Sequence, residues 1–160
     1  MNSGTDALIL SMNGLGIGKG DEVIVPPNSY LATASSVALA GATPVFADVR
    51  DDYNLDPEKF EQAITAKTKA VIAVHLTGRP ADMKPIQEIA DRHGIYVLED
   101  AAQAVGATYY GQTVGSFGIA AGFSLHPLKN LSAAGDAGIT TTDNQDCLLY
   151  TSDAADDLVG

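Results

Sequence analysis

The residue with the clearest chemical potential is Lys129, in the segment Ser124-Leu125-His126-Pro127-Leu128-Lys129-Asn130. The apolar run 118–123 just before this segment predicts a strand, and Pro127 restricts the backbone of the turn that follows. A lysine that is partly removed from water at a strand end loses its proton more readily, so its amine can attack a carbonyl carbon and form an imine. The alternative is an ordinary surface lysine in a loop.

A second distinctive segment ends a predicted strand, 95–100, in the carboxylates Glu99 and Asp100, with Gln103 three residues further on. The sites of α/β sheets lie beyond the carboxyl ends of the parallel strands. Asp100 and Lys129 are therefore expected at one edge of the sheet.

Other residues could contribute binding groups, each with a simpler structural alternative. Gly4 and Thr5 begin a predicted helix that Ser3 can cap, and free backbone N–H groups beside a hydroxyl suit a phosphate; a plain helix cap is the alternative. Tyr30 could stack on a flat ligand from the first turn of its helix, or simply pack. His75 ends a predicted strand and could belong to the site, but a histidine satisfied by structural hydrogen bonds is the favoured interpretation.

The elements that must position these residues alternate between strand and helix. Predicted strands span 22–25, 44–48, 69–75, 95–100, 118–123 and 138–142, and predicted helices span 5–13, 30–40, 56–66 and 82–93. Asn28 and Ser29 are expected to cap the second helix. Apolar residues run through the strand 69–75 without alternation, as in a parallel strand covered on both faces. This order predicts an α/β fold with a doubly wound, mostly parallel sheet and right-handed crossovers.

The composition narrows the class of protein. With 160 residues, 46% of them apolar, the chain can form one domain with a substantial core. A net charge of −11 argues against nucleic acid or an anionic membrane as partner, because both attract basic surfaces. No apolar run is long enough for a membrane span and no secretory leader is evident, so a cytoplasmic location is expected. The single cysteine excludes an internal disulfide and a cysteine metal cluster.

Together the candidate residues supply the groups that pyridoxal 5′-phosphate requires. A carboxylate can keep the pyridine nitrogen protonated, so that the ring accepts the electrons left when an imine loses its α-proton. A lysine can hold the cofactor's aldehyde as an imine and then carry protons, while a helix N-terminus anchors the phosphate. The sequence therefore predicts this cofactor and no metal.

The chain resembles the DegT/DnrJ/EryC1/StrS sugar aminotransferases from residue 3 to about 146. The resemblance rests on several ordered motifs: Ser3-Gly4-Thr5-Asp6-Ala7-Leu8, Gly20-Asp21-Glu22-Val23, Glu99-Asp100-Ala101-Ala102-Gln103-Ala104, the Lys129 segment and Gly135-Asp136-Ala137-Gly138. It implies the large domain of fold-type-I pyridoxal phosphate enzymes, a three-layer α-β-α sandwich around a mostly parallel, seven-stranded type of sheet. Where this chain has Ala137-Gly138 the family usually has two glycines, a change expected only to tighten a turn.

The resemblance also implies residue roles. Lys129 would be the Schiff-base lysine and catalytic acid/base, Asp100 would pair with the pyridine nitrogen, and Gln103 would contact the ring's 3-oxygen. Tyr30 would stack on the cofactor face. The residues implied to hold the phosphate are Gly4, Thr5 and Ser124, whereas His126 and Asn130 are weaker candidates for direct contact.

The implied reaction moves an amino group from an amino acid, commonly glutamate, to a nucleotide-linked keto-sugar, as in the biosynthesis of polysaccharides or antibiotic sugars. A homodimer is implied for the full-length parent. Three alternatives stay open: a sugar dehydratase on the same fold, a non-catalytic binder of cofactor or sugar, and an inactive fragment. The dehydratase relatives replace the lysine with histidine, so Lys129 favours the transferase.

The two ends of the chain differ from what the resemblance implies. Residues 1–146 are expected to form part of the cofactor-binding large domain, without the family's N-terminal segment and small C-terminal domain. Residues 147–160 lack basic residues and a clear amphipathic repeat, and they resemble a translated sequencing adapter. We interpret them as a non-native tail, with a frayed C-terminal helix as the alternative.

Overall fold

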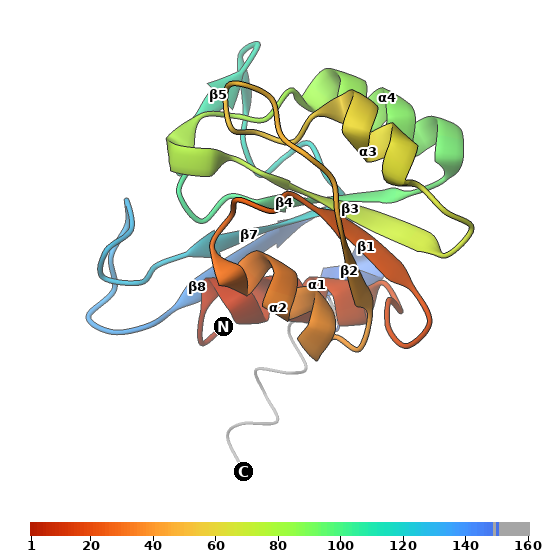
Figure 1. Ribbon diagram of the computed structural model, residues 1–160. Helices are drawn as coiled ribbons and strands as arrows, with labels where there is room; N and C mark the ends of the chain where they lie inside the picture. Colours follow the sequence, from red (N-terminus) through yellow and green to blue (C-terminus); the bar gives the residue numbers. More distant parts are fainter. Residues whose placement is uncertain (149, 151–160) are drawn as a thin grey trace.

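A six-stranded sheet forms the centre of the protein in the computed structural model, which describes residues 1–148 and 150 (Figure 1). Its strand order is β2-β1-β3-β4-β7-β8. The strands are β1 (Glu22–Val25), β2 (Thr43–Phe46), β3 (Thr68–Val74), β4 (Tyr96–Asp100), β7 (Ala120–Ser124) and β8 (Gly138–Thr142). The first five are parallel, and β8 runs antiparallel to β7. The predicted α/β class and mostly parallel sheet are confirmed, and β8 is an antiparallel edge.

Helices cover both faces of this sheet, which gives the expected three layers. Figure 1 shows α1 (Gly4–Gly14) and α2 (Leu31–Leu39) below the sheet, and α3 (Pro57–Ala63) and α4 (Met83–His93) above it. Neighbouring residues of β3 pack on opposite sides of the sheet. Ile72 belongs to the core between the sheet and helices α1 and α2, while Val71 belongs to the core between the sheet and helices α3 and α4. A strand buried on both faces needs apolar residues without alternation, which is why the run in β3 predicted it correctly.

Local sequence signals explain several of the helix ends. The hydroxyl of Ser3 accepts a hydrogen bond from the backbone N–H of Asp6 at the start of α1. Gly94, with φ of 64°, ends α4 in the left-handed conformation. The predicted cap of α2 is wrong: Tyr30 is its N-cap residue and makes no side-chain capping bond, while the Ser29 hydroxyl bonds to Thr33 instead.

The strand order places the reversal of winding at β1 and β3. From β1 the chain passes outward to β2 and then returns to β3 on the other side of β1. Ligands of doubly wound sheets bind at such a switch point, beyond the carboxyl ends of the strands. The segments that leave β1, β3, β4 and β7 therefore meet at the edge where Asp100 was expected.

A small hairpin was absent from the sequence prediction. Strands β5 (Thr108–Tyr109) and β6 (Gln112–Thr113) pair antiparallel across Tyr110 and Gly111, both of which have positive φ. A short 3-10 turn, η1 (Leu76–Gly78), also follows β3. No helix in the described part of the chain is long and apolar enough to cross a membrane.

The proposed boundary at residue 147 falls within a helical segment. Residues 145–148 and 150 are helical, and the Cys147 side chain is buried in the same hydrophobic core as Leu8 and Met12 of α1. Residues 149 and 151–160 lie outside the described part of the chain. The interpretation of 147–160 as a non-native tail stays a prediction.

Candidate active site

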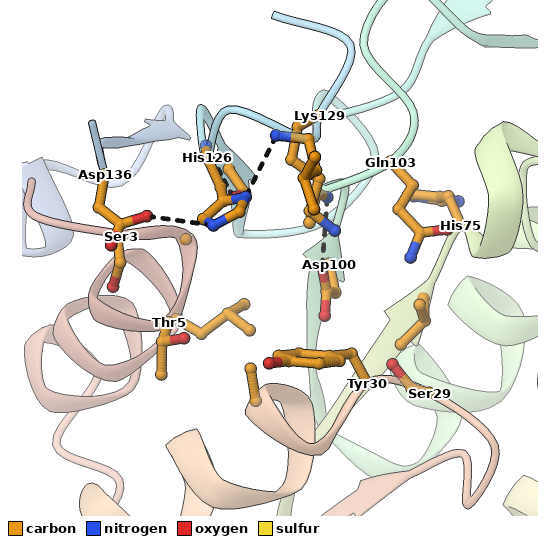
Figure 2. A pocket seen from close by; sticks show the side chains of 17 residues that line it. Ser3, Thr5, Ser29, Tyr30, His75, Asp100, Gln103, His126, Lys129 and Asp136 are labelled. Atoms are coloured by element: carbon orange, nitrogen blue, oxygen red, sulfur yellow. Dashed lines mark hydrogen bonds and ion pairs between the residues drawn. The ribbon is translucent and has the colours of Figure 1, made fainter. Parts of the chain in front are cut away.

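A cavity of about 370 Å³ opens at the carboxyl ends of the strands (Figure 2). All seven residues predicted for the site line it: Gly4, Thr5, Tyr30, Asp100, Gln103, Ser124 and Lys129. These residues come from four separate regions of the chain, and the fold brings them together. His126 also lines the cavity, as does Asp136 of the loop before β8.

The Asp100 carboxylate is fixed through both of its oxygens. Asp100 is the last residue of β4 and is 8% exposed. Its Oδ2 accepts a hydrogen bond from the Thr33 hydroxyl at 2.7 Å, and its Oδ1 accepts one from the backbone N–H of Ala102 at 3.2 Å. A carboxylate held in this way presents a fixed negative charge to the cavity, suited to a protonated ring nitrogen. No pattern in the sequence pointed to Thr33.

The Gln103 side chain is oriented by the turn that follows β3. Its Oε1 accepts a hydrogen bond of 2.7 Å from the backbone N–H of Thr77, a residue held at φ of 55°. The amide NH₂ is therefore left as the donor toward the cavity (Figure 2). A donor in this place can contact an oxygen substituent of a ring that sits over Asp100.

The start of α1 approaches the end of β7 very closely. A Cβ at Gly4 would lie 2.8 Å from the Cβ of Ser124, so only glycine fits without movement. Gly138 at the start of β8 has a similar role, because a Cβ there would overlap the carbonyl oxygen of Ser3. The helix N-terminus, Thr5 and Ser124 together could hold an anion, and we call this group the anion seat.

Lys129 and Tyr30 lie on either side of Asp100 in the view of Figure 2. Lys129 is half-buried, and its backbone N–H donates to the carbonyl of His126 at 2.8 Å, closing the turn after β7. His126 Nε2 also lies 3.8 Å from a carboxylate oxygen of Asp136. Tyr30 is 75% exposed, so its ring is available to a flat ligand.

His75 also lines the cavity, but both of its ring nitrogens are hydrogen-bonded within the protein, which supports the structural interpretation, and Glu99 is its partner. The His75 Nδ1 accepts the backbone N–H of Ala81 at 3.0 Å, so its Nε2 carries the proton and donates to Glu99 at 3.0 Å. Burial raises the pKa of Glu99, but the hydrogen bonds from His75 and from the backbone N–H groups of Gly118 and Gly115 outweigh it and leave the pKa below the ordinary value.

The arrangement can bind and activate a flat, anionic carbonyl compound. It combines an amine that can attack a carbonyl, a fixed carboxylate, an aromatic face and an anion seat within one cavity. Among the described residues, no group of three or more His, Cys, Asp or Glu side chains could hold a metal ion.

Comparison with known proteins gives consistent matches. The model of the DegT/DnrJ/EryC1/StrS aminotransferase family matches residues 1–150. The chain is 51% identical over 143 residues to the dTDP-3-amino-3,4,6-trideoxy-alpha-D-glucose transaminase of Streptomyces venezuelae, covering 89% of this chain and 38% of that protein. It is 55% identical over 141 residues to the UDP-N-acetyl-3-dehydro-alpha-D-glucosamine 3-aminotransferase of Acidithiobacillus ferrooxidans, covering 88% of this chain and 38% of that protein.

The chain is also similar to a solved structure that contains a bound cofactor. The structure of NtdA from Bacillus subtilis with bound cofactor PMP has a TM-score of 0.88 and 39% identity, over 93% of this chain and 34% of that one. The chain thus spans 38% of the length of the two curated relatives above.

Proposed function

Because this chain belongs to the DegT/DnrJ/EryC1/StrS aminotransferase family, we propose that the whole protein is a pyridoxal-phosphate-dependent aminotransferase acting on a nucleotide-linked keto-sugar. The observation that carries the proposal is the single cavity lined by Lys129, Asp100, Gln103, Tyr30 and the anion seat. The two relatives named above, both sugar-nucleotide aminotransferases by name, support the substrate class.

The cavity residues fit the cofactor by their chemistry. Pyridoxal phosphate, when bound, supplies an electron-accepting ring that stabilises the carbanion left after an amino-acid carbon loses its proton. Asp100 would hold the proton on the ring nitrogen, and Gln103 would donate to the ring oxygen. Lys129 would bind the aldehyde carbon through Nζ, and later accept and return the substrate proton.

The remaining residues would bind and cover the cofactor. Gly4, Thr5 and Ser124 would hold its phosphate through backbone N–H groups and hydroxyls, at the positive end of α1. Tyr30 would cover one face of the ring and limit the access of water.

The proposal includes the partners and location expected from the sequence. The amino donor is an amino acid, probed first with glutamate, and the protein acts as a homodimer in the cytoplasm. Exposed apolar side chains around the cavity mouth support a partner there: Tyr30 and Leu128 line the cavity, Leu31 follows Tyr30 in the chain, and the three are between 74% and 87% exposed. Residues 1–146 remain assigned to a larger cofactor-binding domain.

An absorbance spectrum with added pyridoxal phosphate tests the proposal. We expect a long-wavelength band from covalently bound cofactor, and retention of cofactor mass after borohydride reduction. Both signals should vanish in Lys129→Ala and persist in Lys84→Ala, which removes an exposed lysine of α4 on the far face of the sheet. Equal covalent labelling of wild type and Lys129→Ala would overturn the assignment of Lys129.

A further inference from the structure

A buried hydroxyl on α2 contacts the carboxylate that the proposed function assigns to the ring nitrogen. Thr33 is 1% exposed, and its Oγ1 lies 2.7 Å from Asp100 Oδ2. The Ser29 hydroxyl lies 2.7 Å from the same Oγ1 on the other side. The three side chains form a line from the cavity wall to the end of β4.

The direction of each hydrogen bond in this line follows from the available protons. An ionised carboxylate only accepts, so the single hydroxyl proton of Thr33 points to Asp100. Thr33 Oγ1 must then accept the proton of Ser29. A hydrogen bond to a charged acceptor is stronger than one between neutral groups, so Thr33 can set the orientation of the carboxylate.

The position of Thr33 couples two parts of the proposed cofactor pocket. It lies one helical turn after Tyr30, and its backbone N–H donates to the Tyr30 carbonyl at 3.0 Å. The first turn of α2 therefore positions both the Tyr30 ring at the cavity and the Thr33 hydroxyl that bonds to the Asp100 carboxylate. Asp100 Oδ1 is held independently by Ala102, so Thr33 alone among the described side chains bonds to the carboxylate.

We propose that Thr33 is a positioning residue, which fixes the Asp100 carboxylate in the orientation that keeps the cofactor's ring nitrogen protonated. This inference rests on the proposed function. Thr33 does not touch the cofactor; it acts through Asp100, and Ser29 supports it by donating the second hydrogen bond.

Thr33→Val tests the proposal, because valine keeps the shape of threonine and removes the donor. With ¹⁵N-labelled pyridoxal phosphate, the resonance of the ring nitrogen should shift toward that of unprotonated pyridine in Thr33→Val. We expect the dissociation constant for the cofactor to rise roughly tenfold. Thr33→Ser keeps the hydroxyl and should restore both values.

A matched control removes another buried hydroxyl from the same helix. Ser36 is fully buried and donates to the Thr33 carbonyl at 2.8 Å, with no bond to Asp100. Ser36→Ala should leave the ring-nitrogen resonance unchanged even if it lowers the melting temperature. An equal shift in Ser36→Ala would mean that any loosening of α2 has this effect, and would overturn the specific role of Thr33.

A double-mutant cycle and a cofactor-free structure complete the test. If Thr33 acts through Asp100, Thr33→Val should not weaken cofactor binding further in an Asp100→Asn background, and full additivity of the two losses in binding free energy would overturn the proposal.

Crystal structures without cofactor should show a rotated Asp100 carboxylate in Thr33→Val only, and an unchanged carboxylate would also overturn the proposal. Failure of the wild type to bind pyridoxal phosphate would instead reject the proposed function, and the crystal structures would still decide whether Thr33 orients Asp100.

Discussion

Glu99 and Asp100 are adjacent carboxylates of β4 with opposite environments. Successive side chains of a strand point to opposite faces, so Asp100 faces the cavity while Glu99 faces the other layer. Glu99 is fully buried and accepts hydrogen bonds from the His75 ring and from the backbone N–H groups of Gly115, Phe117 and Gly118. Glu99 thereby attaches the segment before β7 to β3 and β4.

We expect Glu99→Gln to destabilise the protein by about 3 kcal/mol at pH 7. Each carboxylate oxygen accepts from two N–H donors, so the NH₂ of glutamine must face donors whichever way the amide turns. Urea unfolding measures the loss. A change below about 1 kcal/mol would contradict this account of Glu99.

The same residue predicts a pH dependence. Because the folded pKa of Glu99 is lowered, its contribution to stability is fully present above the unfolded value of about 4.3 and is lost as the pH falls through the folded pKa. The stability difference between wild type and Glu99→Gln should therefore shrink in acid. Glu61→Gln is the control: hydrogen bonds from Arg92 and His93 lower the Glu61 pKa, but this carboxylate is exposed to solvent, so the effect should be small.

The close approach of α1 to β7 predicts that adding one methyl group at Gly4 lowers both stability and cofactor affinity. Gly4→Ala places a Cβ 2.8 Å from that of Ser124 and must push the helix start away from the strand. We expect a loss of about 1–3 kcal/mol in stability and a cofactor affinity reduced at least tenfold, measured by thermal unfolding and fluorescence titration. Gly18→Ala is the control, since its new methyl would meet its nearest neighbour at an ordinary 3.5 Å. Equal affinities for Gly4→Ala and wild type would contradict the anion seat.

The side chain of Tyr109 attaches the hairpin β5–β6 to Asp82, the N-cap residue of α4. The Tyr109 hydroxyl donates to Asp82 at 2.5 Å, and burial together with this hydrogen bond raises the pKa of Tyr109 to about 12. In an alkaline titration followed by absorbance, Tyr109 should ionise in a late step at about pH 12. The late step should disappear in Tyr109→Phe and persist in Tyr110→Phe, whose ring is 92% exposed. Persistence of the late step in Tyr109→Phe would refute this assignment.

The sequence predicted the elements that depend on local signals, but not those that depend on distant partners. The β3 run, the Ser3 cap and Gly94 each carry their signal within a few residues, and the structure confirms them. Strands β5 and β6 have two residues each, and their position depends on Tyr109 meeting Asp82, the N-cap residue of α4. No local pattern announces such a contact.

The residues of the candidate site also fall into those that the sequence predicted and those that depend on contacts between distant segments. Lys129 and Asp100 were predicted because strand ends in an α/β sheet converge and the residue types are chemically distinctive. Thr33 was missed because a threonine in a helix of small residues looks like packing. Its role appears only when α2 is seen beside β4, 67 positions later in the chain.

For the whole molecule, the apolar residues around the cavity mouth predict self-association. Leu128→Asp should raise the dissociation constant of the proposed homodimer by roughly tenfold or more, because an unpaired charge would be buried at the interface. Sedimentation velocity measures it. Leu39→Asp introduces the same charge at the far end of α2 and should leave the constant unchanged. A monomeric wild type, or equal constants for both variants, would contradict a partner at the mouth.

The position of α1 has a consequence for the order of events during synthesis. This helix precedes every strand of the described residues, yet it packs on β7 and β8, and the Gly138 N–H donates to the carbonyl of Met1 at 3.0 Å. A ribosome releases α1 more than a hundred residues before β7 and β8, so the surface of α1 that packs on these two strands stays uncovered until they emerge. The anion seat and Lys129 can meet only after β8 has emerged. Cofactor capture is thus confined to the time after β8 has emerged, and a nascent chain stalled before residue 138 should not retain pyridoxal phosphate.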